Sequence, residues 1–174
     1  MKSALHARLK KIKLLVMDVD GVLTDGKIVV DARGKELKFF DVQDGFGLVL
    51  LRQADIKTAI LSARSSPAVT ARAEDLKIDK ICQDAYPKRS SYERLIRELG
   101  CRDEQVCFMG DDLPDLPILK RVGFAVAVPN AVGELKKAAH YVTTQRGGDG
   151  AVREVAELIL KAQGQWKNIL ARIG

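Results

Sequence analysis

Short apolar runs alternate along this chain with longer segments in which apolar residues recur every three or four positions. The runs are typical of strands buried on both faces, and the segments between them are typical of amphipathic helices. This alternation predicts an α/β fold, a doubly wound Rossmann-like parallel sheet covered by helices on both faces. We expect strands at 14–17, 58–61, 80–82, 106–109 and 124–128, and helices at 47–53, 68–76, 90–99, 116–121, 132–138 and 151–162.

One stretch after the first strand departs from this alternation. Residues 27–31 and 36–40 are β-prone and flank a polar segment that contains Gly34. They predict a β-hairpin at about 27–40. With 174 residues the chain is long enough for one domain, 1–174, with a substantial core, and short for two. We expect the residues after Gly164, 164–174, to form a mobile tail.

The most informative polar residues are Asp18 and Asp20, which follow the first apolar run and are followed at once by Gly21. The strand period of two puts both carboxylates on one side of the chain as the strand ends. Two crowded carboxylates repel each other and favour a cation beside them, and Mg²⁺ prefers such oxygen ligands. One carboxylate is then free to act as a nucleophile and the other as an acid and base. Taken alone, the pair is equally consistent with two solvated acids at a strand end.

Polar residues also follow the later strands, at the edge where open α/β sheets build their sites. Ser62 precedes a helix, and its hydroxyl with the backbone N–H groups there suits an oxyanion. Lys88 precedes the next helix. Each of these residues, taken alone, has an ordinary role as a helix cap or a solvated side chain. Three acids follow the fourth strand, more than capping explains: Asp111, Asp112 and Asp115.

Charge balance supports a site that binds a phosphate. Asp18, Asp20 and Asp111 carry about −3 near pH 7, which Mg²⁺ and Lys88 together offset. A phosphate dianion then needs further positive charge, and Arg64 and Arg72 are the candidates.

Composition excludes several other classes of function. The net charge is +6, but the basic residues are spread along the chain without an aromatic stripe, so we expect no nucleic-acid partner and a small anionic substrate instead. No apolar stretch approaches the ~20 residues that span a membrane, and the basic N-terminus lacks the apolar run of a secretory signal. The three cysteines form no CxxC pair and indicate reduced thiols in a cytoplasmic protein. Two histidines make a zinc site or a Ser-His-Asp triad improbable.

The order of these motifs resembles the haloacid dehalogenase superfamily of phosphotransferases, and within it the small phosphatases of 3-deoxy-D-manno-octulosonate 8-phosphate. The resemblance covers nearly the whole chain. It is carried by MDVDGVLTDG at 17–26, DGFG at 44–47, GDDLPD at 110–115 and GGDGAVREV at 147–155. A related nine-carbon sugar acid phosphate is the alternative substrate, although Arg64 favours the eight-carbon one.

The resemblance implies a role for each matching residue. Asp18 would attack phosphorus and bind Mg²⁺. Asp20 would protonate the leaving oxygen and then deprotonate water, while its backbone carbonyl binds the metal. Asp111 would be the third protein ligand of the metal. The remaining implied roles are support of the metal site by Asp112 and Asp115, phosphate binding by Ser62 and Lys88, and substrate contacts by Asp44, Gly45, Arg64 and Arg72.

The resemblance also implies an assembly. Only the hairpin separates the first motif from the next helix, so no cap domain is inserted, and capless relatives form homotetramers through this hairpin. The exposed apolar residues of a two-stranded ribbon support that expectation. The segment after Arg146 is expected to help close a neighbour's site.

Two positions depart from the family's pattern. Ala63 stands where relatives commonly have glycine, and Val49 where they often have Lys or Arg. A phospho-acceptor receiver domain uses similar residue types, but its acidic pair lies near the first strand and its acceptor follows a later one. Here the DxD motif comes first, which disfavours that alternative.

Overall fold

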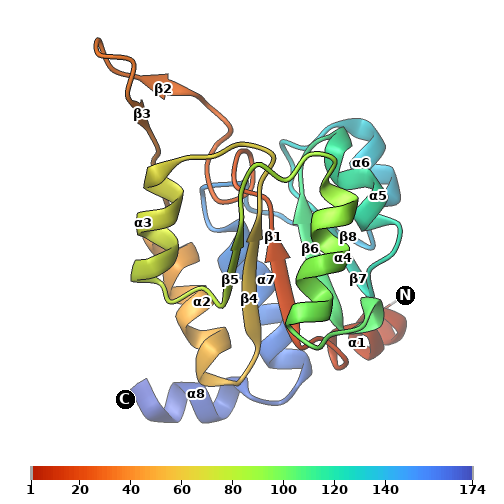
Figure 1. The fold of residues 1–174 in the computed structure, drawn as a ribbon. Coiled ribbons are helices and arrows are strands. Elements are labelled where there is room, and N and C mark those ends of the chain that lie inside the picture. The colour runs from red at the N-terminus through yellow and green to blue at the C-terminus, as the bar shows by residue number, and fades with distance from the viewer. Residues whose placement is uncertain (1, 174) are drawn as a thin grey trace.

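The computed structural model describes residues 2–173 and has a parallel six-stranded sheet at its centre (Figure 1). The strand order is β5-β4-β1-β6-β7-β8, so β1 lies in the middle of the sheet. This confirms the predicted α/β class. The strands are β1 (Leu14–Met17), β4 (Lys57–Leu61), β5 (Lys80–Cys82), β6 (Val106–Gly110), β7 (Phe124–Ala127) and β8 (Tyr141–Val142).

Helices cover both faces of the sheet (Figure 1). In that view α4 lies in front of the sheet, while α2 and α7 lie behind it and pack against each other. The central strands are buried on both faces, which explains their continuous apolar sequence. The helices are α1 (Lys2–Leu9), α2 (Val42–Gln53), α3 (Pro67–Asp75), α4 (Lys88–Glu98), α5 (Leu116–Leu119), α6 (Gly133–Ala138), α7 (Ala151–Ala162) and α8 (Trp166–Ile173), with short 3₁₀ turns η1 (Asp103–Gln105) and η2 (Leu113–Asp115).

The main differences from the expected helices are at the start of α2 and at the end of the chain. The helix expected at 47–53 is α2, which begins earlier, at Val42, because the side chain of Asp41 accepts a hydrogen bond from Asp44 N (2.8 Å) and caps it. The chain end expected as a mobile tail instead forms α8, which buries Ile169 in the core. The expected boundaries at residues 1 and 174 lie outside the described residues.

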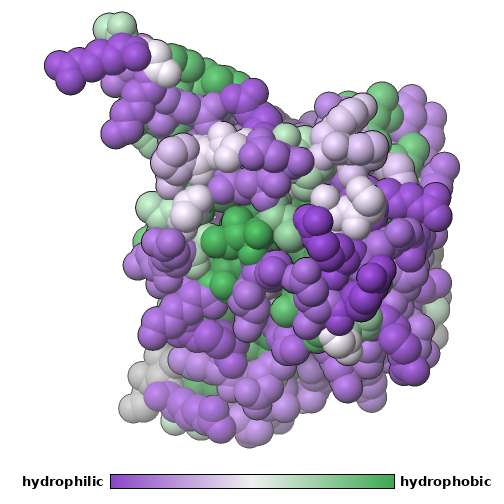
Figure 2. Space-filling view, viewed as in Figure 1, coloured by the Kyte–Doolittle hydropathy of each residue, from purple (hydrophilic) through white to green (hydrophobic). Residues whose placement is uncertain are grey.

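The hairpin extends from the edge of the molecule as an arm (Figure 1). Its paired strands are shorter than expected, with β2 at Val29–Val30 and β3 at Glu36–Leu37. The carboxylate of Asp31 closes the turn by accepting hydrogen bonds from the backbone N–H groups of Arg33 and Lys35. Figure 2 shows exposed apolar side chains along the arm. The exposed ones are Ile28, Val30, Leu37 and Phe39.

The parallel register brings the strand ends together. Met17 pairs with Ile60 of β4 on one side and with Met109 of β6 on the other. The residues that follow these strands, Asp18, Ser62 and Asp111, therefore leave the sheet at one edge. The C-terminal helix α8 lies at the opposite end of the molecule (Figure 1). None of the helices within residues 2–173 is both long and apolar enough to cross a membrane.

Candidate active site

Asp18 lies at the end of β1 and is held at both carboxylate oxygens. Its Oδ1 accepts a hydrogen bond from Val19 N (2.7 Å), and its Oδ2 lies 2.7 Å from Lys88 Nζ. Burial raises the pKa of Asp18 to about 6, the charge of Asp115 acts in the same direction, and Lys88 opposes both. Asp18 is thus a fixed carboxylate whose negative charge is only partly offset.

Lys88 is the first residue of α4 and is almost fully buried. Its Nζ contacts Asp18 and also Asp115 Oδ1 at 2.6 Å. Asp115 is fully buried and accepts a second hydrogen bond, from Asp111 N at 3.0 Å, through Oδ2. Asp115 therefore anchors both the lysine and the loop that carries Asp111. Gly110 leaves room for this contact, because a Cβ there would lie 2.5 Å from Asp115 Oδ2.

Asp111 follows β6 and faces the loop after Asp20. A Cβ at Gly21 would lie 2.1 Å from Asp111 Oδ2, and Gly21 has a φ of +87°, so the site needs glycine there for both reasons. Burial raises the pKa of Asp111 to about 7, and the charges of Asp18 and Asp115 add to the effect. Asp112 is more exposed and caps η2, accepting a hydrogen bond from Leu113 N.

These carboxylates fit a hard divalent cation. One oxygen each of Asp18, Asp111 and Asp115 lie within 4.8 Å of one another. Asp115 is fully buried and does not line the cavity, whereas Asp18 and Asp111 do, which leaves these two as the available ligands. Oxygen donors and uncompensated negative charge are what Mg²⁺ requires.

Ser62 follows β4 and is buried, with its Oγ accepting a hydrogen bond from Arg64 N at 3.2 Å. α3 begins only at Pro67, so a loop, and not a helix start, follows Ser62 directly. One cavity of about 240 Å³ joins this loop to the acidic residues. It is lined by Asp18, Asp20, Gly26, Ser62, Ala63, Arg64, Lys88, Asp111, Asp112 and Pro114.

The side chain of Asp20 is turned toward the hairpin, which the sequence did not lead us to expect. Its Oδ1 accepts a hydrogen bond from Lys38 Nζ, and its Oδ2 lies 3.5 Å from Arg64 Nε. Glu36 pairs with both of these cations. Lys38 and Glu36 have no motif signature in the sequence, because a hairpin of alternating charged and apolar residues is typical of any exposed ribbon.

Three of the predicted substrate residues lie elsewhere. Asp44, Gly45 and Arg72 line a separate cavity of about 10 Å³, enough for one water molecule at most. Asp44 Oδ1 accepts a hydrogen bond from Arg153 N (2.8 Å) in the first turn of α7, so Asp44 holds α7 against α2. A Cβ at Gly45 would lie 2.3 Å from Arg72 Nη2. Their role in substrate binding stays a prediction.

Asn130, which sequence reasoning missed, ties two loops behind the site. Its Nδ2 donates to Gly21 O (2.8 Å), and its Oδ1 accepts from Gly147 N (2.9 Å). The neighbouring Gly148 N donates to Val22 O at 2.9 Å. The start of the segment after Arg146 is thus tied to the loop after β1 of its own protomer, and its part in closing a neighbour's site stays a prediction.

Comparison with known proteins agrees with this arrangement. A model of the haloacid dehalogenase-like hydrolase family matches residues 78–155. A 3-deoxy-D-manno-octulosonate 8-phosphate phosphatase of Yersinia pestis is 46% identical over 156 residues, which cover 90% of this chain and 83% of the relative. The chain belongs to this phosphatase family.

Solved structures of the phosphatase family have the same fold. One from Moraxella catarrhalis, in complex with magnesium, phosphate and the sugar acid KDO, is 42% identical, has a TM-score of 0.97 and covers 100% of both chains. A cobalt-bound structure from Haemophilus influenzae is 41% identical, with a TM-score of 0.87, and covers 90% of this chain and 92% of that one. The likeness therefore extends through the hairpin and α8.

The two departures from the family's pattern lie in different surroundings. Ala63 lines the cavity that also contains Asp18. Val49 is half-buried on α2 and is not among the residues that line this cavity.

Proposed function

We propose that this protein is a Mg²⁺-dependent phosphomonoester hydrolase that releases phosphate from 3-deoxy-D-manno-octulosonate 8-phosphate. The observation that carries the proposal is Asp18, a carboxylate held by Lys88 in one cavity with Asp20, Ser62 and Asp111. A nucleophile, a proton donor and cationic partners for a phosphate are the parts that phosphomonoester hydrolysis needs. The family's curated members carry this activity in their names.

Hydrolysis would proceed in two steps. In the first, a carboxylate oxygen of Asp18 bonds to phosphorus, the bond to the sugar oxygen breaks, and Asp20 gives that oxygen a proton. In the second, Asp20 takes a proton from water as the water oxygen bonds to phosphorus and Asp18 is released. Ser62 and Lys88 hold the phosphoryl oxygens through both steps. Mg²⁺, held by Asp18, Asp111 and the backbone carbonyl of Asp20, would supply charge neutralisation at the phosphoryl group.

The substrate preference rests on the cations at the open side of the cavity. Arg64 lines the cavity and is half-exposed, so it can reach a group beyond the phosphate. A sugar acid phosphate has a carboxylate as well as a phosphate, and the positive charge of Arg64 suits that carboxylate. The alternative is the phosphate ester of a related nine-carbon sugar acid, since the same charges would serve both.

The experiment that tests the function is phosphate release from a panel of sugar phosphates with Mg²⁺ present. We expect the eight-carbon sugar acid phosphate to have the highest kcat/KM, with the nine-carbon acid next and neutral sugar phosphates far behind. Asp18→Asn should lose at least ~10³-fold in kcat and keep its fold, because it removes the nucleophile with little change in volume. Asp25→Asn, an exposed acid in the loop after β1 with no assigned role, is the matched control. An Asp18→Asn variant with most of its activity would contradict the mechanism.

We also propose a homotetramer built through the hairpin, in the cytoplasm. The support for assembly is the arm's exposed apolar side chains, with Phe39 72% exposed. The support for the compartment is that Cys82, Cys101 and Cys107 are free thiols. Replacing Val30 and Phe39 by glutamate should yield monomers in light scattering and raise KM. Arg33→Glu at the arm's tip is the control, and an unchanged mass in the double variant would refute this assembly.

A further inference from the structure

Four charged side chains form a closed ring at the open side of the active-site cavity. Asp20 and Arg64 come from the cavity wall, and Glu36 and Lys38 come from the hairpin. Lys38 Nζ bonds to Asp20 Oδ1 and lies 2.9 Å from Glu36 Oε1. Arg64 Nε lies 3.5 Å from Asp20 Oδ2, and its Nη2 bonds to Glu36 Oε2. Positive and negative groups alternate around the ring, so their charges sum to zero.

The burial of Lys38 sets it apart from an ordinary hairpin lysine. Its side chain is 2% exposed, whereas that of Lys27 at the start of the same arm is 80% exposed. An ammonium group that loses its hydration must be compensated by anionic partners, and here the two partners are Asp20 and Glu36. Such an arrangement fixes the positions of all three groups.

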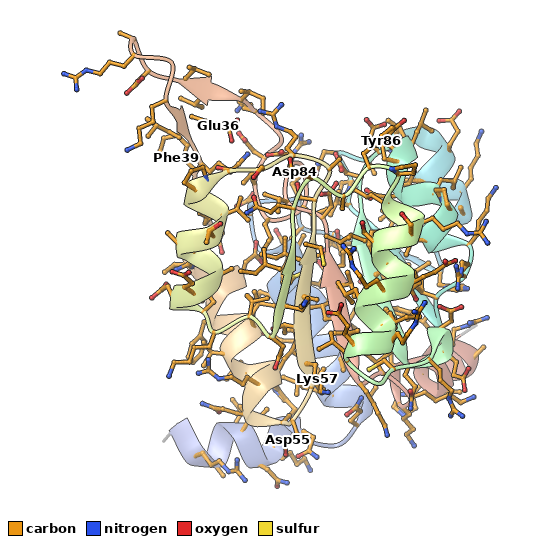
Figure 3. The ribbon with its side chains drawn as sticks, in the orientation of Figure 1. Glu36, Phe39, Asp55, Lys57, Asp84 and Tyr86 are labelled. Carbon is orange, nitrogen blue, oxygen red and sulfur yellow. The ribbon has the colours of Figure 1, made fainter. Side chains whose placement is uncertain are left out.

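The alternation along β3 directs this lysine toward the site. Glu36 and Lys38 face the strand ends, while Leu37 and Phe39 face outward and are exposed. Figure 3 shows Glu36 above the edge of the sheet where the strands end and Phe39 on the outer side of the arm. One side of the hairpin is therefore part of its own protomer's active site.

We propose that Lys38 is a positioning residue for Asp20, with Glu36 holding the lysine in turn. This inference rests on the proposed function. Each of the two catalytic acids then has its own buried lysine: Lys88 fixes Asp18, and Lys38 fixes Asp20. Because Lys38 engages Oδ1, it leaves Oδ2, whose contact with Arg64 is long, as the atom that exchanges protons with the leaving oxygen and with water. Lys38 itself keeps its proton throughout.

The test compares kcat/KM for Lys38→Met on three substrates that differ in their need for a proton donor. The sugar acid phosphate and a neutral sugar phosphate both release an alkoxide, which must be protonated, whereas p-nitrophenyl phosphate releases a stable phenolate. We expect kcat/KM to fall at least ~10-fold for both sugar phosphates and less than ~2-fold for p-nitrophenyl phosphate, since positioned proton transfer contributes ~10² or more. A general disturbance of the fold would lower all three values alike.

Three further variants sharpen the comparison. Lys27→Met removes an exposed lysine from the same arm and should change nothing. Lys38→Arg keeps the charge and should recover part of the loss, and Glu36→Gln should show the same pattern to a smaller extent. Each is measured on the same three substrates with saturating Mg²⁺.

Three outcomes would overturn the inference. Equal losses on all three substrates would mean that Lys38 only supports the fold, and no loss would mean that Asp20 needs no anchor. A loss confined to the sugar acid phosphate would mean that Lys38 binds the substrate's carboxylate. The proposed function fails separately, if the unaltered protein hydrolyses p-nitrophenyl phosphate but not the sugar acid phosphate. The neutral sugar phosphate still tests Lys38 in that case.

Discussion

The two carboxylates at the expected metal position should make Mg²⁺ affinity fall as the solution becomes acidic. Burial raises the pKa of Asp18 to about 6 and that of Asp111 to about 7 in the metal-free protein. Mg²⁺ binds the ionised carboxylates, so below these pKa values protons compete with the metal. The affinity for Mg²⁺ is therefore highest at pH 8 and is lost progressively as the pH falls through 7 and then 6.

The size of the effect follows from the fraction of each group that is ionised. Between pH 8 and pH 6, Asp111 goes from about 90% to about 10% ionised, which weakens binding about tenfold. Asp18 becomes about half-protonated, which adds about a factor of two. The dissociation constant for Mg²⁺ should therefore rise about 20-fold over this range.

Isothermal titration calorimetry of metal-free protein with MgCl₂ at pH 6, 7 and 8, at constant ionic strength, measures this directly. Asp111→Asn should bind Mg²⁺ more weakly and keep only the twofold part of the pH dependence. Asp25→Asn, which removes an exposed acid outside the metal site, should keep all of it. Equal dissociation constants at pH 6 and pH 8 in the unaltered protein would refute the reasoning, because Lys88 would then suffice to keep both acids ionised.

Three other predictions test the metal, the helix anchor and the loop contact. EDTA should abolish activity, excess Mg²⁺ should restore it, and Ca²⁺ should inhibit, because its longer bonds and higher coordination number suit a different geometry; turnover in chelator would contradict this. Burial raises the pKa of Asp44 to about 6, so the folded state binds its proton more tightly than the unfolded state does, and stability should fall by about 2 kcal/mol as the pH rises from 4 to 7. Urea denaturation with Mg²⁺ present should show that Asp44→Asn lacks this pH-dependent part of the stability. The same dependence of stability on pH in the variant and the unaltered protein would exclude this role of Asp44. Gly147→Ala places a Cβ 1.8 Å from Gly21 O and should cost about 1–3 kcal/mol of stability and reduce kcat, while Gly133→Ala, with open space around it, should cost nothing; equal denaturation midpoints would show that the loop yields without strain.

The sequence predicted the elements whose pattern is set locally. The first strand and the helix at 151–162 were predicted at the residues where β1 and α7 occur, because each has a complete apolar run or stripe. The start of α2 was missed because its glycines disfavour a helix; Gly47 is needed there only because Arg153, far along the chain, lies against it. The short strand β8 depends on pairing that no local pattern records. Helix α8 does have a local signal, because Trp166, Ile169 and Leu170 recur at helical spacing, and sequence reasoning missed it.

The part of the candidate site that follows the strand ends could be predicted from the sequence. The strand ends bring Asp18, Ser62, Lys88 and Asp111 to one edge, and these residues line one cavity, while their roles stay predictions. Sequence reasoning could not find Lys38, because only the path of the hairpin decides whether such a lysine is solvated or buried beside an acid.

The central place of β1 ties metal binding to the completion of folding. Met17 pairs with Met109, so the acids that follow them meet only after the intervening chain has formed its own strands and helices. Contacts between residues so distant in sequence form late and slowly. Mg²⁺ would then find no complete set of ligands in a partly folded chain and would favour the finished sheet alone, by about 2.7 kcal/mol at a hundred times its dissociation constant. The cofactor would thus slow amide hydrogen exchange across the whole sheet, including strands that never touch it.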